Sequence, residues 1–216
     1  MATNVYLIRH GEAFSNVDGT LGGEKGDKGL TERGFAQAQA LATRLAGNPF
    51  GAEVLYASTL LRARQTAETI APALGLPIIF DDEIQELRPG PEIDGMRFSA
   101  VREIYPNIER FLSDVFTPLG PGGESWGSFQ LRVSAALDRI ITAHTGKKIV
   151  LVAHGGVIEV SFLHMLALGP QTRSRVAFHA RNTAITHWRH SETHGGREEW
   201  HLVSHNDDRH LDGLEG

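Results

Sequence analysis

Short apolar runs alternate with longer amphipathic stretches along most of this 216-residue chain. Four of the apolar runs have the length and residue types of buried strands; they occupy residues 4–8, 52–58, 76–82 and 147–156. Four stretches have apolar residues at helical spacing; they occupy residues 28–47, 59–75, 128–146 and 157–169. Strands that alternate with helices predict an α/β fold, a three-layer sandwich whose mainly parallel central sheet carries helices on both faces.

Local signals refine these elements. Thr31 is placed to cap the helix over 28–47, which Gly47 ends, and Ser58 is placed to cap the helix over 59–75. Pro72 predicts an end or a bend in the last turn of that second helix. Near the C-terminus, two further strands are expected at 183–190 and 197–205. They flank Gly195 and Gly196, a hairpin signal, with Trp188 and Trp200 packed beneath.

One segment breaks the alternation. Residues 88–123 are rich in proline and glycine and contain only short apolar clusters. The remaining chain is long enough for one sizeable core but short for two. We therefore expect a single domain over 1–216, with 88–123 inserted as a cap of short helices over the strand ends.

Composition excludes several classes of function. The chain has no cysteine, so disulfides, thiolate metal sites and a cysteine nucleophile are ruled out. The net charge is −5 and no basic run stands out, which argues against nucleic acid as a partner. No apolar run has the roughly 20 residues of a membrane span. No export signal is evident, which makes the cytoplasm the expected compartment, and nothing indicates an oligomeric state.

Chemically useful side chains follow the predicted strands. Arg9 and His10 end the first strand, Arg62 lies one turn into the helix after the second, Glu86 follows the third, and His154 ends the fourth. Because the carboxyl ends of parallel strands share one edge of the sheet, where ligands bind, these groups are expected to converge. Taken singly, each has an ordinary explanation, such as a surface arginine or one more acidic residue after residues 81–83. Their conjunction favours a site.

This set suits phosphoryl transfer. Two arginines can hold the oxygens of one phosphoryl group, and a neutral imidazole can attack phosphorus to form a covalent intermediate. A second histidine, protonated beside the phosphate, is expected to add charge and a donor. A carboxylic acid can protonate the leaving oxygen and later deprotonate water. Glycines next to both histidines, including Gly155, allow the backbone to approach the ligand.

The same segments resemble the histidine phosphatase, or phosphoglycerate mutase-like, superfamily over most of the chain. The matching motifs are "LIRHGEAFSN", "GLTERGFAQA", "STLLRARQTAE", "IQELRPG", "PGGES", "LVAHGGVI" and "HNDDRHL". The resemblance implies that His10 is the phosphate-accepting nucleophile, that Glu86 is the acid and that His154 is the second pocket histidine. It also implies phosphate contacts from Arg9, Asn16 and Arg62, and no required metal or cofactor.

Three departures from the family pattern stand out. Ala13 takes a position where serine is commoner, and Pro89 and Pro91 alter the segment after the acid. The glycine-rich loop 17–27 aligns poorly; Thr20 or Gly22 is a candidate substrate contact there.

The expected activity is hydrolysis of a small phosphorylated metabolite, in the phosphatase branch of the family. The alternatives are a phosphatase narrowed by its cap, a phosphoglycerate mutase and a non-catalytic phospho-ligand-binding protein. Residues 89–123 contain three separated arginines and five acidic residues, which disfavours a mutase that must retain a bisphosphate. A pure binding protein would not need Glu86.

A metal site near the C-terminus is a further alternative. Seven histidines lie there: His179, His187, His190, His194, His201, His205 and His210. His187 and His201 could face one another across the hairpin. Scattered histidines at strand edges are the favoured interpretation, because no regular ligand pair accompanies them.

Overall fold

The computed structural model describes residues 2–105, 108–192 and 195–214. Six strands form one sheet: β1 (Thr3–Arg9), β2 (Val54–Ser58), β3 (Ile78–Asp81), β4 (Lys148–Ala153), β5 (Ile185–Glu192) and β6 (Glu198–Asp207). Their order is β3-β2-β4-β1-β5-β6. The first four in this order are mutually parallel, while β5 and β6 are antiparallel to their neighbours. The predicted α/β fold with a mainly parallel sheet is confirmed.

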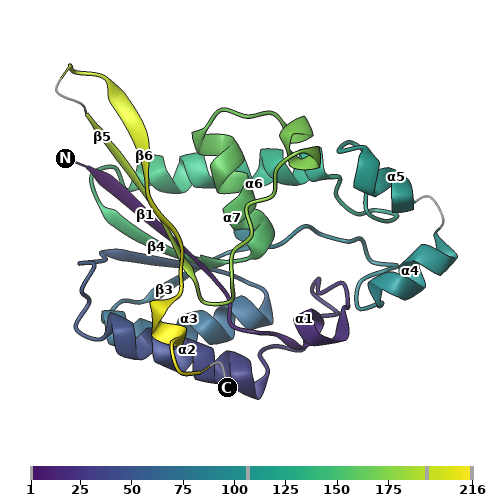
Figure 1. The fold of residues 1–216 in the computed structure, drawn as a ribbon, viewed down its shortest axis with the longest axis horizontal. Helices are drawn as coiled ribbons and strands as arrows, with labels where there is room; N and C mark the ends of the chain where they lie inside the picture. Colours follow the sequence, from purple (N-terminus) through teal and green to yellow (C-terminus); the bar gives the residue numbers. More distant parts are fainter. Residues whose placement is uncertain (1, 106–107, 193–194, 215–216) are drawn as a thin grey trace.

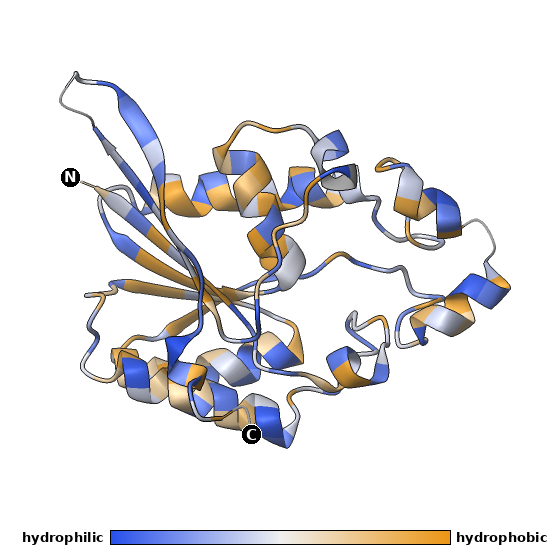
Figure 2. Cartoon of the chain, in the orientation of Figure 1, coloured by the Kyte–Doolittle hydropathy of each residue, from blue (hydrophilic) through white to orange (hydrophobic). Residues whose placement is uncertain are grey.

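Helices cover both faces of the sheet (Figure 1). The helices α2 (Glu32–Leu45) and α3 (Leu61–Leu74) pack on one face, and α6 (Trp126–Ala143) and α7 (Gly155–Met165) pack on the other. Strand β1 shows why both faces are apolar: Val5 and Leu7 join the core under α6 and α7, whereas Tyr6 and Ile8 join the core under α2 and α3. Figure 2 shows hydrophobic residues gathered on the central strands and on the helix faces turned toward them.

Local sequence explains how α2 and α3 begin and end. The Thr31 hydroxyl accepts a hydrogen bond from the Gly34 amide at 3.0 Å, so the predicted cap of α2 is confirmed. A Cβ at Gly34 would overlap the Glu12 carbonyl oxygen, which makes glycine necessary where α2 passes the loop after β1. Pro72 lies in the last turn of α3, and Gly75, with φ of 67°, ends that helix in the left-handed conformation.

One local prediction is wrong, and one possible pair of histidines is not formed. Ser58 does not cap α3: it is the last residue of β2, Leu60 occupies the cap position, and the Ser58 hydroxyl bonds to His154 instead. His187 and His201 do not face each other across the hairpin. Irregular pairing around His187 shifts the register, so that His187 lies opposite Ser204 and His201 lies opposite Arg189.

Short helices lie beyond the carboxyl ends of the parallel strands. Figure 1 shows α1 (Phe14–Asp18), α4 (Phe98–Ile104) and α5 (Ile108–Ser113) at the end of the molecule away from the hairpin tip. The segment over 88–123 has its own apolar cluster, formed by Ile93, Val101, Ile108, Phe111 and Leu119. Three short 3₁₀ helices complete the chain: η1 (Asp82–Ile84), η2 (Pro170–Ser174) and η3 (Arg209–Leu211). No helix in the described ranges is long and apolar enough to cross a membrane.

Candidate active site

The side chains predicted from the strand ends meet around one cavity of 360 Å³. Its lining includes Arg9, His10, Asn16, Arg62, Glu86 and Gly155. His154 is fully buried directly behind this lining, with its ring centroid 5.2 Å from that of His10. The carboxyl ends of the parallel strands β1, β2 and β4 share one edge of the sheet. The segments that follow these strands therefore bring their side chains to the same cavity.

The tautomer of His10 is set by the backbone. Its Nδ1 lies 2.6 Å from the Gly11 carbonyl oxygen, which can only accept, so Nδ1 carries the proton. The backbone around it is fixed in turn, because Asn182 donates to the His10 carbonyl at 2.9 Å and the Gly11 amide donates to Thr66 at 3.0 Å. Burial, with the charges of Arg62 and then Arg9, holds the pKa of His10 well below its usual value. The ring is therefore neutral, with an unprotonated Nε2.

Arg62 holds that Nε2 and is itself held from the glycine-rich loop. Its Nε donates to His10 Nε2 at 3.1 Å. Its terminal nitrogen donates to the Gly22 carbonyl at 2.8 Å and pairs with Asp27 at 3.0 Å. The Arg62 and Asp27 side chains are only 4% and 2% exposed, so each charge depends on the other for compensation. Asp27 was missed by the sequence analysis, although it stands directly before the "KGLT" motif.

His154 has one engaged and one free ring nitrogen. Its Nε2 lies 2.7 Å from the Ser58 hydroxyl, while its buried Nδ1 has no hydrogen-bond partner in the described part of the chain. The Ser58 oxygen also accepts a 3.4 Å bond from the Leu60 amide. If the hydroxyl proton goes to His154 Nε2, every Ser58 group is used and Nδ1 is left as an N–H donor. Ser58 was therefore missed as a group that orients His154.

Without a bound phosphate, the environment of His154 disfavours the protonated ring. Burial comes first, followed by the charge of Arg62, and together with the charge of Arg9 they hold the pKa of His154 well below its usual value. The ring is neutral in the ligand-free site. It therefore offers a ligand an Nδ1–H group that no described residue engages, rather than a positive charge.

Arg9 lies where α7 begins. One terminal nitrogen donates to the Ala180 carbonyl at 2.7 Å, and its buried Nε has no partner among the described residues. That Nε faces Gly155, since a Cβ placed there would lie 3.7 Å from it. The N-terminus of α7 and the Arg9 guanidinium thus flank the same space, which favours an anion.

Glu86 completes the cavity from the other side. Its two carboxyl oxygens accept bonds from the Gly156 and Leu87 amides, each at 3.0 Å. A Cβ at Gly156 would overlap Glu86 Oε1 and lie 3.0 Å from Phe129, so only glycine permits this approach. The carboxyl group is thereby fixed at the start of α7, beside the histidines.

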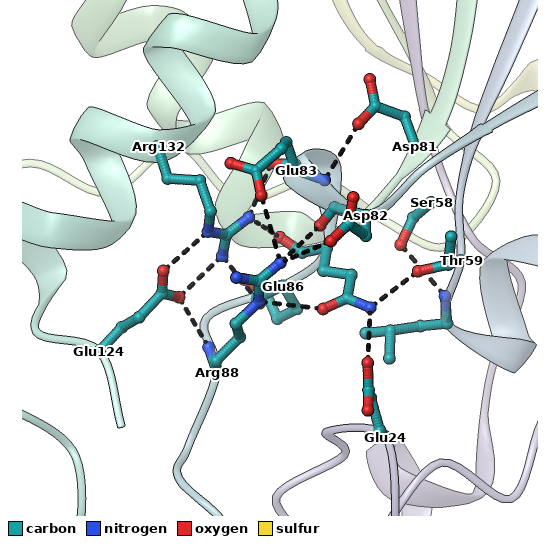
Figure 3. A network of polar contacts seen from close by, with 12 residues as sticks. Glu24, Ser58, Thr59, Asp81, Asp82, Glu83, Glu86, Arg88, Glu124 and Arg132 are labelled. Carbon is teal, nitrogen blue, oxygen red and sulfur yellow. Dashed lines mark hydrogen bonds and ion pairs between the residues drawn. The ribbon is translucent and has the colours of Figure 1, made fainter. Parts of the chain in front are cut away.

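A buried ion pair holds the segment that carries Glu86 (Figure 3). Arg132 of α6 makes two 2.7 Å bonds to Glu124 and donates to the carbonyl oxygens of Glu83, Gln85 and Glu86 at 2.7, 3.2 and 3.3 Å. Burial raises the pKa of Glu124, but hydrogen bonds from Arg132 and the Arg88 amide outweigh it and leave the pKa below normal. The "PGGES" motif therefore contributes an ionised anchor, a role that the sequence alone did not reveal.

The glycine-rich loop is fastened to the segment 88–123. Asp94 accepts bonds from the amides of Gly23, Lys25 and Gly26 at 2.8 to 3.0 Å. Thr20 and Gly22 both line the cavity, as do Ser15 and Asn16. The Gly22 carbonyl is already used by Arg62, and Asn16 Oδ1 accepts from the Ala13 amide at 3.0 Å, leaving its Nδ2 as the group able to donate.

The C-terminal histidines that the structure describes do not line this cavity. Over the described ranges, which omit His194, no three histidine or acidic side chains are grouped so as to hold a metal ion. His187 bonds to Asn4 and stacks on Tyr6, and His210 bonds to Thr183, so these two rings have structural partners.

Comparison with known proteins places the chain. The model of the histidine phosphatase superfamily (branch 1) matches residues 5–208. A probable phosphoglycerate mutase GpmB from Escherichia coli O1:K1 is 32% identical over 209 residues, covering 96% of this chain and 94% of that protein.

Solved structures agree with that match. A phosphoserine phosphatase variant from Entamoeba histolytica in complex with phosphoserine has a TM-score of 0.78 and 30% identity, covering 97% of this chain and 99% of that one. Bacillus stearothermophilus YhfR has a TM-score of 0.80 and 25% identity, with the same coverage of 97% and 99%. The chain belongs to the histidine phosphatase superfamily.

Proposed function

We propose that this chain is a phosphomonoester hydrolase that acts on a small phosphorylated metabolite through a phosphohistidine at His10. The observation that carries the proposal is the orientation of the His10 ring. The Gly11 carbonyl holds its proton on Nδ1, and its Nε2 accepts a hydrogen bond from Arg62 in a cavity that Arg9 also lines. A nucleophile for phosphorus needs this lone pair.

The proposed reaction has two steps. Nε2 of His10 attacks phosphorus, the bond from phosphorus to the ester oxygen breaks, and Glu86 gives its proton to the departing alcohol. A water molecule then attacks the phosphohistidine and passes its proton to Glu86 as the P–N bond breaks. Arg9, Arg62 and the Nδ1–H of His154 bind the phosphoryl oxygens where negative charge develops, and Asn16 and the Gly155 amide add donors. We propose that no metal ion is required, because these donors supply the electrostatic stabilisation.

A mutase is the second candidate, because a curated relative is called a probable phosphoglycerate mutase. A mutase must bind a second phosphate, yet the cations that line the cavity are Arg9 and Arg62, both placed at His10. Two arginines of the segment 88–123 are paired elsewhere, Arg102 with Glu109 and Arg110 with Asp114. This arrangement favours water over a second substrate hydroxyl as the phosphoryl acceptor.

Three measurements test the proposal. Wild-type protein quenched in alkali after brief exposure to labelled monoester should carry acid-labile, base-stable phosphate, and His10→Ala should lose both this label and turnover, by about 10⁴-fold or more. Label retained in His10→Ala would reject the nucleophile.

With 3-phosphoglycerate, isomerisation that depends on added 2,3-bisphosphate and releases little phosphate would establish the mutase. Dialysis against a chelator should leave hydrolysis unchanged; a loss restored by a divalent ion would reject metal independence.

A further inference from the structure

We propose that the cavity selects phosphomonoesters of small, uncharged and largely apolar alcohols, and discriminates against leaving groups that carry a carboxylate. This inference rests on the proposed function, because it concerns the alcohol part of the same substrate. It follows from the division of the cavity into a charged end and an apolar end.

The charged end is fully committed to the phosphoryl group. Among the residues that line the cavity, the cationic side chains are Arg9 and Arg62, and both lie at His10. The other ionisable side chains in the lining are acidic: Glu86, the proposed proton donor, and Glu159. Ser15, Asn16 and Thr20 are polar but neutral. A carboxylate on the leaving group would therefore find no cation of its own among the residues that line the cavity.

The other end of the cavity is apolar. Its wall is made by Leu21, Leu87, Phe98, Phe111, Leu119 and Trp126. Moving a carboxylate from water against such a wall without a partner is strongly unfavourable, whereas burying methylene groups there is favourable. The wall thus favours alcohols with methylene groups and disfavours alcohols with a carboxylate.

This wall is built in advance rather than assembled around a ligand. Phe111 and Leu119 are 7% exposed and belong to the apolar cluster of the segment 88–123, and Leu21, Leu87 and Phe98 pack against that cluster. Asp94 ties the glycine-rich loop, which contains Leu21, to the same segment through three amide bonds. Because these side chains are fixed in the fold, a cationic side chain from a neighbouring segment cannot easily take their place in the wall.

Cavity size limits the alcohol. The volume of 360 Å³ is near the lower end of the roughly 300–1,000 Å³ of small-molecule pockets, and the phosphoryl group takes part of it. A short alkyl or single-ring alcohol fits this remaining space.

Paired ligands of equal length provide the test. Straight-chain alkyl phosphates should rise in kcat/KM by about fourfold for each added methylene until the cavity is full. Butyl phosphate should exceed the phosphate ester of 4-hydroxybutanoate by about 100-fold or more. Equal rates for this pair, or a preference for the carboxylated ester, would overturn the inference.

Non-hydrolysable ligands separate this inference from the proposed function. The same preference should appear in the dissociation constants of butylphosphonate and 4-phosphonobutanoate, measured by calorimetry whether or not the protein turns over any ester. Absence of hydrolysis with a retained binding preference would reject the proposed function alone. Equal binding of the two phosphonates would reject the selectivity.

A charge placed in the wall sharpens the test. Phe98→Lys should narrow the butylphosphonate to 4-phosphonobutanoate ratio by about 10-fold or more, because it adds a cation to the apolar end. Phe116→Lys is the matched control: Phe116 lies in the same segment, is 62% exposed and does not line the cavity. The control should retain the wild-type ratio, and a shift of the same size in both variants would contradict the assignment of the wall.

Discussion

The two halves of the cavity are built differently. The half at His10 and His154 is made by strand ends of one parallel sheet, with both rings buried and their partners provided by the backbone, Ser58 and Arg62. The half at Glu86 is made by an irregular segment, which the Arg132–Glu124 pair and the Gly156 amide hold in place. The difference teaches that strand ends bring the histidines together, with single bonds from Asn182, Thr66 and Arg62 fixing the nucleophile. The acid lies outside the sheet and is held by anchors from α6 and α7.

The largest expected effect is a loss of hydrolysis rate in the half at Glu86, and its size depends on the leaving group of the substrate. Glu86→Gln should slow alkyl phosphates by roughly 10²–10⁴-fold, because the proton for the alcohol is lost. Aryl phosphates should be slowed far less, since a phenolate leaves without protonation. Steady-state rates on both classes, with labelled phosphohistidine as a check that His10 still reacts, decide the outcome. Equal losses on the two classes would reduce Glu86 to a positioning residue.

Removal of the anchor should affect stability as well as rate. Arg132→Met leaves Glu124 buried without its cation and should lower the free energy of unfolding by about 3–5 kcal/mol in urea titrations. The double variant Arg132→Met, Glu124→Met should recover most of that stability, because no unpaired charge remains.

The rates of the double variant then report on positioning. The carbonyl oxygens of Glu83, Gln85 and Glu86 lose their donor in both variants. Hydrolysis of alkyl phosphates should therefore stay reduced in the double variant, with aryl phosphates affected less. A double variant that is stable and fully active would show that the network serves stability alone.

Sequence information was sufficient to bring the two histidines and the two arginines together, for a physical reason. Arg9, His10 and His154 each follow a buried strand directly, and parallel pairing then brings strand ends together without further detail. Arg62 follows within one helical turn. The supporting groups were not identified, because their contacts join residues far apart in the sequence. The Asp27 contact with Arg62 spans 35 positions, the Ser58 contact with His154 spans 96, and the Arg132 bond to Glu86 spans 46. Such contacts depend on loop paths, which hydrophobic periodicity does not encode.

A smaller effect is expected from Ser58. Ser58→Ala removes the hydroxyl that fixes the His154 tautomer and should reduce kcat by about 10-fold, equally for alkyl and aryl phosphates, because only the phosphoryl half is touched. Ser58→Thr retains the hydroxyl and should preserve more activity. The ¹⁵N shifts of His154 provide the readout that a packing defect would not change: Nδ1 should be the protonated nitrogen in the wild type and a mixture in Ser58→Ala. Unchanged shifts in Ser58→Ala would reject this role.

The smallest expected effect is a dependence of the free energy of unfolding on pH. His10 and His154 are held neutral in the folded protein because burial and the neighbouring arginines lower both pKa values, whereas the unfolded chain has ordinary histidines near 6.5. Below pH 6.5 the unfolded state binds more protons, so stability should fall as the pH drops, by up to about 1.4 kcal/mol per pH unit for each histidine. His210, whose pKa is lowered to about 4 mainly by burial, adds to the same slope.

Carboxylates do not obscure this window. Asp207 has a lowered pKa, chiefly through hydrogen bonds from Arg209 and Arg44, so its stabilisation is lost only below its ordinary value of 3.8. Urea titrations between pH 7 and pH 5 therefore report the histidines. His10→Asn, whose amide can still donate near the Gly11 carbonyl, should lower the slope by about one proton, and an exposed substitution such as Leu131→Gln should leave it unchanged. An unaltered slope in His10→Asn would mean that this ring binds protons equally in the folded and unfolded states, so that folding does not lower its pKa, and the buried environment would then not be what keeps its lone pair free for attack on phosphorus.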